Sequence, residues 1–323
     1  IVYSGDLGVI MNNLLMERSA LVNVPTNPFF LGGTAQWAVF ILLLVAFGIK
    51  LPMFPFHTWM LKVHAEAPPS LVMLHSGVML KMGAYGLLRF GILLFPAQAK
   101  QWALVLAALG VINILYGALL AFVQKDFKLV LAYSSVSHMG VVLLGLAAFN
   151  QTGMQGAIFQ MVSHGLISAL MFLIVGSLYE RTETTTLGEL GGLAKAIPFI
   201  SGVLLAGGMA LLGLPGLSGF IGEFMAFLGL FGAAKTAAVI GALGIIFAAV
   251  YTLRGVLSIT FGPMPDKYRD IRDARVAEAI PMIALVAFIV LLGVYPAILN
   301  QPLEATVSAF DHLLNNLSVK VGG

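Results

Sequence analysis

Five ionisable side chains lie inside long apolar runs of this sequence, and together they could carry protons. They are Lys50, Lys81, His138, His164 and Glu223. An ammonium at membrane depth costs about 2.5–3.5 kcal/mol on insertion scales, so such groups normally face a bundle interior or a water-filled path. Burial disfavours the charged form of lysine and of glutamate, so a row of such groups linked by water can exchange protons near neutral pH. These residues therefore predict an ion path at mid-membrane.

Each of the five residues also has a structural interpretation. Lys50 and Lys81 could form ion pairs that only stabilise the fold, and Glu223 could be a carboxylate satisfied by hydrogen bonds. A single helical histidine is more often packed and hydrogen-bonded than functional, so both interpretations stay open for His138 and His164.

A second group of polar residues lies near the first polar turn. His57, His64 and Glu66 do not show the tight spacing of metal ligands, so capping or fixing of the turn is favoured over a metal site. His75 lies six residues before Lys81, well off the Lys81 face of a helix, and its role is open.

The composition is that of a polytopic α-helical membrane protein. Of 323 residues, 59% are hydrophobic and 10% are charged, whereas soluble domains carry about 25% charged residues. The apolar runs are too long for the strands of a membrane barrel. The net charge of +3 is small and its basic residues lie mostly in loops, which argues against nucleic-acid binding. The chain has no cysteine, which excludes Cys-ligated iron–sulfur clusters and disulfides within it.

Eight membrane segments are expected, so the predicted fold class is an all-α transmembrane helix bundle. Two of them are broken, one near Pro52 and Pro55 and the other at Gly213–Gly219, because proline removes a backbone donor. Broken membrane helices occur where neighbours or cavity water satisfy the freed backbone groups. The expected segments are residues 35–57, 69–95, 99–123, 127–149, 153–180, 196–229, 235–261 and 279–299.

The basic residues of the loops predict the orientation in the membrane. Loops after odd-numbered segments hold nine of them: Lys62, Lys125, Lys128, Arg181, Lys195, Lys267, Arg269, Arg272 and Arg275. Loops after even-numbered segments, with the tail, hold three: Lys100, Lys235 and Lys320. The positive-inside rule therefore places the ends of the odd-numbered segments in the cytoplasm.

The two ends of the chain have a different character from the apolar segments. Residues 1–33 contain polar pairs and prolines and are expected to form a surface segment with a short amphipathic helix. Because the chain begins with isoleucine, we expect its N-terminal part to be missing. Leu303, Val307, Phe310 and Leu314 predict an amphipathic helix at the interface.

Five motifs of the chain resemble motifs of the antiporter-like subunits of respiratory complex I. Among these subunits, the resemblance is greatest to the M-type branch. The resemblance covers about residues 35–300. The matching motifs are Lys50–Trp59 (KLPMFPFHTW), His64–Pro68 (HAEAP), Leu80–Phe90 (LKMGAYGLLRF), Ala132–Gly140 (AYSSVSHMG) and Gly213–Phe224 (GLPGLSGFIGEF). His75 departs from the M-type pattern and is more similar to the L-type branch, and Met60–His64 also departs from it.

The resemblance implies a fragment of a 14-helix subunit built from two inverted five-helix repeats, each with a broken helix. Residues 1–33 would then be the surface segment and residues 34–97 the end of the first repeat. Residues 98–262 would be the second repeat, and residues 263–323 the C-terminal helix with an interfacial tail.

The resemblance also implies a role for each buried ionisable residue. Lys50 matches the lysine of the first broken helix, whose acidic partner would lie before Ile1. Lys81 matches the lysine that links two half-channels, while His138 and His164 match histidines of the central hydrophilic axis. Glu223 matches the acid of the distal half-channel.

The function implied is proton translocation in the membrane arm of NADH:quinone oxidoreductase. This chain would hold no cofactor or metal, and NAD, flavin, iron–sulfur clusters and quinone would bind in other subunits. Its partners would be antiporter-like L- and N-type subunits, small membrane subunits, the lipid bilayer of the bacterial inner membrane and protons. The alternatives are a subunit of an Mrp-type Na⁺/H⁺ antiporter, the membrane arm of an energy-converting hydrogenase, or a scaffold that transports nothing.

Overall fold

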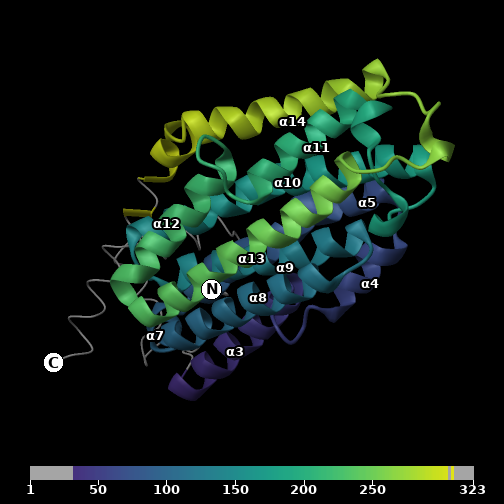
Figure 1. Cartoon of the computed structure of the whole chain (residues 1–323). Coiled ribbons are helices and arrows are strands. Elements are labelled where there is room, and N and C mark those ends of the chain that lie inside the picture. Colours follow the sequence, from purple (N-terminus) through teal and green to yellow (C-terminus); the bar gives the residue numbers. More distant parts are fainter. Residues whose placement is uncertain (1–31, 305–306, 309–323) are drawn as a thin grey trace.

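The computed structural model describes residues 32–304 and 307–308, and that part of the chain is an all-α bundle (Figure 1). Seven described helical stretches are long and apolar enough to cross a membrane. They are α3 (Gly33–Lys50), Pro69–Ile92, α8 (Ala103–Val123), α9 (Phe127–Ala147), α10 (Gln151–Thr182), α13 (Lys235–Thr260) and α14 (Val276–Val294).

Both breaks that the sequence predicts are confirmed. The first segment divides into α3, which ends at Lys50, and α4 (Thr58–Glu66). The sixth divides into α11 (Pro198–Leu211) and α12 (Ser218–Ala233). Gly213 adopts φ +76° in the connection between α11 and α12, a conformation that glycine adopts without steric cost.

The second segment has an irregularity that the sequence pattern does not predict. It begins with α5 (Pro69–Leu74), and α6 (Leu80–Gly86) is flanked by two π-helical turns, η1 (His75–Met79) and η2 (Leu87–Ile92). Such turns are rare in proteins and occur frequently at functional sites. The helix that carries Lys81 is therefore set off from a regular α-helix on both sides.

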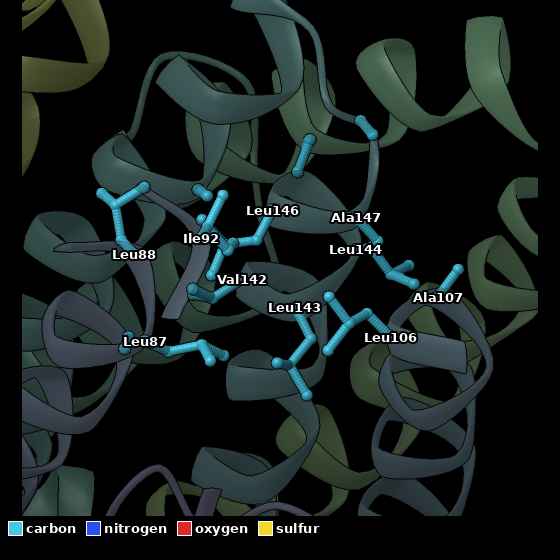
Figure 2. Packing of buried hydrophobic residues seen from close by; sticks show 14 of the residues in the cluster. Leu87, Leu88, Ile92, Leu106, Ala107, Val142, Leu143, Leu144, Leu146 and Ala147 are labelled. Carbon is cyan, nitrogen blue, oxygen red and sulfur yellow. The ribbon is translucent and has the colours of Figure 1, made fainter. Parts of the chain in front are cut away.

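The helix α9 lies at the centre of the bundle, and 89% of its most apolar stretch is buried. Its apolar residues belong to a cluster that also includes side chains of η2 and α8. In Figure 2 the leucines of α9 lie between Leu87 and Ile92 on one side and Leu106 and Ala107 on the other. By contrast, only 22% of the most apolar stretch of α14 is buried. This helix exposes large apolar side chains, as a lipid-facing helix does.

Glycines let α10 and α12 approach each other backbone to backbone. A Cβ at Gly156 of α10 would lie 2.4 Å from the backbone nitrogen of Ala226, and one at Gly222 of α12 would lie 2.8 Å from the Cα of Gln160. In the same way, Gly83 lets α6 approach the backbone at the end of α3, because a Cβ at Gly83 would lie 2.5 Å from the backbone nitrogen of Leu51. Small residues are enriched at such contacts in membrane bundles.

Charged loops gather at one end of the bundle, which also holds α4 and the start of α5 (Figure 1). Arg181 at the end of α10 pairs with Glu278 at the start of α14 at 2.8 Å. Asp273 accepts hydrogen bonds from the backbone of Phe199 and Ile200, the first turn of α11. The short helix α7 (Pro96–Gln101) lies at the opposite end.

Lys128 is counted among the loop residues in the orientation prediction, although it lies within the expected segment 127–149. It belongs to the first turn of α9 and is buried, so it is not an exposed loop charge. Its Nζ donates to the carbonyls of Ala65 and Ala67, at 3.1 and 2.9 Å, where α4 ends. Unpaired carbonyls at a helix end attract a cation, which explains why this lysine turns inward.

The ends of the chain lie partly or wholly outside the described residues. Of the surface segment expected at residues 1–33, residues 1–31 lie outside the described part of the chain, as do Phe310 and Leu314. Residues 297–304 are helical, with Leu303 packed against the core, and Val307 is buried. The division into repeats at residues 97 and 262 stays a prediction.

The close contact of α10 and α12 can be tested by adding one methyl group. Gly156→Ala should destabilise the protein by about 1–3 kcal/mol, because the new Cβ meets rigid backbone of α12. The measurement is the unfolding midpoint of the full-length chain in detergent. The control is Gly202→Ala in α11, where a Cβ would have no neighbour within 4 Å. Equal midpoints for the two variants would contradict the packing described.

Candidate functional site

The centre of the candidate site is Lys81 of α6, which is held by two uncharged groups. Its Nζ lies 2.8 Å from Nδ1 of His164 in α10, within hydrogen-bond distance, and it donates a hydrogen bond to the backbone carbonyl of Ser76 in η1. A lysine ammonium can only donate, so Nδ1 of His164 is the acceptor. A neutral His164 therefore carries its ring proton on Nε2.

A second buried pair continues from there. Nδ1 of His138 in α9 donates to Oε1 of Glu223 in α12 at 2.9 Å, and Nε2 of Gln160 lies 3.5 Å from the same oxygen. The ring centroids of His138 and His164 are 5.1 Å apart. Lys81, His164, His138 and Glu223 thus form one row, and we call them the buried row.

All four residues of the buried row are largely shielded from solvent by the described part of the chain. Exposed fractions are 9% for Lys81, 2% for His164, 3% for His138 and 8% for Glu223. Four different helices supply the residues, and glycines of α10 and α12 allow the backbones to come close enough. Four of the five ionisable residues singled out in the sequence are therefore brought together by the fold.

Lys50, the fifth residue, lies beside the buried row and is not part of it. It ends α3, it is half-buried, and within the described residues its side chain has no hydrogen bond or ion pair. The backbone of Lys50 packs closely against Gly83, which is two residues from Lys81. A Cβ added at Gly83 would lie only 2.8 Å from the carbonyl carbon of Lys50. The first break thus lies directly against the helix that carries Lys81.

Polar atoms around the buried row are suited to holding water. A cavity of about 10 Å³ lies beside His164, and Ser134, Ser135 and Ser168 supply its other polar lining; this is roughly the volume that one water needs. Nε2 of His138 and Nε2 of His164 are buried without a hydrogen-bond partner among the described residues. Buried polar atoms of proteins bind protein groups or ordered water.

Several polar contacts near the buried row are missed by the sequence reasoning. Nε2 of His64 lies 2.9 Å from Nδ1 of His75, and the hydroxyls of Ser76 and Ser135 are 3.3 Å apart. Tyr251 of α13 donates to Ser134 at 3.1 Å. The available signal was a polar residue in an almost wholly apolar helix, but it does not reveal which of these residues meet.

No group of three metal-ligating side chains occurs in the described part of the chain.

Comparison with known proteins identifies the family. Residues 10–252 match the family model described as NADH:quinone oxidoreductase/Mrp antiporter, transmembrane. The chain belongs to this antiporter-like family. The NADH-quinone oxidoreductase subunit M of Rickettsia conorii is 40% identical over 294 residues, which cover 91% of this chain and 57% of the relative.

Solved structures of the family share the fold. A chain of respiratory complex I from Thermus thermophilus matches with a TM-score of 0.83 and 34% identity, over 94% of this chain and 66% of that one. A chain of the Mrp complex from Dietzia matches with a TM-score of 0.80 at 23% identity, over 95% of this chain and 66% of that one, and so shares the fold alone. The chain spans little more than half the length of the curated relatives it matches.

The pairing of His138 with Glu223 predicts a large effect on stability. Glu223→Ala leaves the buried Nδ1–H of His138 without its acceptor, and a buried donor left unsatisfied destabilises a protein by about 1–3 kcal/mol. Glu223→Gln keeps an acceptor oxygen and should cost less. The measurement is again the unfolding midpoint in detergent.

The matched control removes an ion pair at the surface. Asp266→Ala breaks the exposed contact of Asp266 with Arg269, and such pairs contribute little to stability. The pairing would be contradicted if Glu223→Ala shifted the midpoint no more than Asp266→Ala does.

Proposed function

We propose that this chain is part of a proton-translocating membrane-arm subunit of NADH:quinone oxidoreductase. The observation that carries the proposal is the buried row, in which Lys81 contacts His164 at 2.8 Å and His138 contacts Glu223 at 2.9 Å. The 40% identity to a protein named NADH-quinone oxidoreductase subunit M supports the same assignment.

The buried row can pass protons without covalent chemistry. The Lys81 ammonium gives a proton to Nδ1 of His164, and that ring releases the proton from its own Nε2 to a water molecule. The water gives a proton to Nε2 of His138, whose Nδ1 proton passes to Oε1 of Glu223. Each transfer forms one bond to hydrogen and breaks one, and an imidazole suits this role because it has two nitrogens.

Energy for this movement must come from outside the buried row. Moving one charge against 100 mV requires about 2.3 kcal/mol. In the proposal, quinone reduction in other subunits changes the charge beside Lys50, and the change in field alters the proton affinity of Lys81. NAD, flavin, iron–sulfur clusters and quinone bind elsewhere, and the chain contacts L- and N-type antiporter-like subunits and small subunits in the bacterial inner membrane.

An Mrp-type Na⁺/H⁺ antiporter subunit is the second candidate, because the matching family description covers both assemblies. The energy source separates the two. In inverted membrane vesicles, proton uptake that starts on adding NADH and stops with a quinone-site inhibitor supports the first candidate. Proton movement driven by a sodium gradient without an electron donor supports the second. The energy-converting hydrogenase would couple proton uptake to oxidation of another electron donor.

Removing the charge carrier at the centre of the buried row should stop proton movement. In Lys81→Met a proton must cross an apolar gap. If placing the charge there raises the barrier by about 2.5–3.5 kcal/mol, proton uptake should slow by about a hundredfold. The measurement is NADH-driven proton uptake by vesicles that hold the complete complex, with assembly checked on native gels.

The matched control for this experiment is Lys62→Met, the same substitution at an exposed lysine of α4. It should pump at the wild-type rate. Undiminished pumping by Lys81→Met would sink the proposal, and undiminished pumping after neutralising all five ionisable residues would favour the scaffold alternative.

A further inference from the structure

One side chain of α8 holds the first break, residues 51–57 between α3 and α4. The backbone N–H of Phe54 donates to Oδ1 of Asn113 at 2.7 Å, and Nδ2 of Asn113 donates to the carbonyl of Pro52 at 3.4 Å. Asn113 lies in the middle of α8 and is fully buried. A single amide thus binds both a donor and an acceptor that the break leaves outside a helix.

Other N–H groups of the first break find acceptors in the backbone nearby. Those of Leu51, Met53 and Phe56 donate to carbonyls at 2.6–2.8 Å. The N–H of Phe54 donates instead to Asn113, 59 residues further along the chain. Inside a membrane bundle every backbone donor needs a partner, so this hydrogen bond ties the unwound segment to a helix distant in sequence.

A second side chain of α8 contacts the same segment. In a helix that is otherwise apolar, Asn113 and Tyr116 are the two residues with polar side-chain atoms. They are three positions apart and therefore lie on one face. The ring of Tyr116 lies 5.3 Å from that of Phe54 and 5.0 Å from that of His57. One face of α8 thus holds the break at Phe54 and at its end.

The same part of α8 is fixed against α9, which carries His138. A Cβ at Gly140 of α9 would lie 2.9 Å from the Cβ of Asn113, so the two backbones approach closely there. The hydroxyl of Ser137 donates to the carbonyl of Ile114 at 3.1 Å. Ser137 and Gly140 flank His138 in the chain, so Asn113 connects the first break to the helix of the buried row.

The position of the first break also sets the position of Lys50. Lys50 directly precedes the break, and its backbone and that of Leu51 lie against Gly83 of α6, where a Cβ would be 2.8 Å and 2.5 Å away from them. Because α6 carries Lys81, a shift of the break relative to the bundle changes the separation of Lys50 from Lys81.

We propose that Asn113 is a positioning residue for proton transfer. By binding the backbone of Pro52 and Phe54 it fixes the first break against α8 and keeps Lys50 beside the helix that carries Lys81. The proposal rests on the proposed function, in which a change of charge beside Lys50 alters the proton affinity of Lys81. The energy between two charges depends on their distance, so a break that can shift transmits that change less well. Asn113 takes up no proton itself.

The decisive substitution is Asn113→Leu, which removes both hydrogen bonds and keeps a side chain of similar size. NADH-driven proton uptake per assembled complex, in vesicles that hold the complete complex, should fall about tenfold. That change corresponds to about 1.4 kcal/mol, within the penalty for leaving a buried donor unsatisfied. Asn113→Asp keeps the acceptor oxygen for the N–H of Phe54 in a side chain of the same shape, so it should retain roughly half of the wild-type rate or more.

Amide hydrogen exchange reports on the break directly. Exchange of residues 51–57, measured by mass spectrometry on the purified complex, should become faster in Asn113→Leu and stay near the wild-type rate in Asn113→Asp, because the N–H of Phe54 loses its acceptor only in the first variant.

The matched control is Asn150→Leu. The side chain of Asn150 also accepts from one backbone N–H, that of Gly153 at 2.9 Å, and donates to one backbone carbonyl, that of Gly229 at 2.8 Å. These bonds join the start of α10 to the last part of α12 and involve neither break. Asn150→Leu should pump like wild type per assembled complex. An equal loss in both leucine variants would show an effect of stability alone and would overturn the proposal.

The remaining outcomes separate the proposal from the proposed function. If Asn113→Leu pumps like wild type while Lys81→Met does not, the positioning role is overturned and the proposed function stands. If Lys81→Met also pumps like wild type, both are overturned. A rate for Asn113→Asp as low as that of Asn113→Leu also overturns the positioning role. If Asn113→Leu does not assemble, Asn113→Ala replaces it, and loss of assembly there as well assigns Asn113 a structural role and overturns the proposal.

Discussion

The low polarity of the bundle interior is the constraint on which the rest of this structure depends. An ammonium buried at Lys81 must be solvated by the protein, and the described groups that do so are a backbone carbonyl and an imidazole. A carboxylate at that distance would favour the charged form and hold the proton in place. Uncharged partners stabilise the ammonium without fixing it, which is what a site that releases its proton requires.

Close helix packing follows from this constraint. Hydrogen bonds between side chains of α6, α9, α10 and α12 require these helices to lie nearly backbone to backbone in the middle of the bundle. Gly156 and Gly222 permit this for α10 and α12, and Gly83 permits it between α6 and the end of α3. The same glycines that allow tight apolar packing therefore set the spacing of the charged groups.

The two helix breaks and the buried row belong to one arrangement. Lys50 ends α3 at the first break, and Glu223 lies in the second turn of α12, just after the other. Gly213 of that second break leaves room for the Glu223 carboxylate, whose Oε2 would be 3.0 Å from a Cβ there. Unwound backbone thus lies next to an ionisable side chain at both ends of the site, while regular and π-helical segments hold the residues between them.

Much of the architecture could be predicted because hydropathy acts locally along the chain. The eight apolar segments follow from hydropathy, and the breaks at Pro52 and at Gly213–Gly219 follow from the backbone chemistry of proline and glycine. The choice of Lys50, Lys81, His138, His164 and Glu223 as proton carriers starts from the cost of placing charge among apolar residues and stays a prediction. Contacts across the bundle depend on helix rotation and spacing, which adjacent residues do not encode. Only the tertiary structure therefore decided that Lys81 meets His164, that Lys50 stays outside the row and that Lys128 turns inward. The pairing of His64 with His75 was likewise set by two helices whose approach no local pattern records.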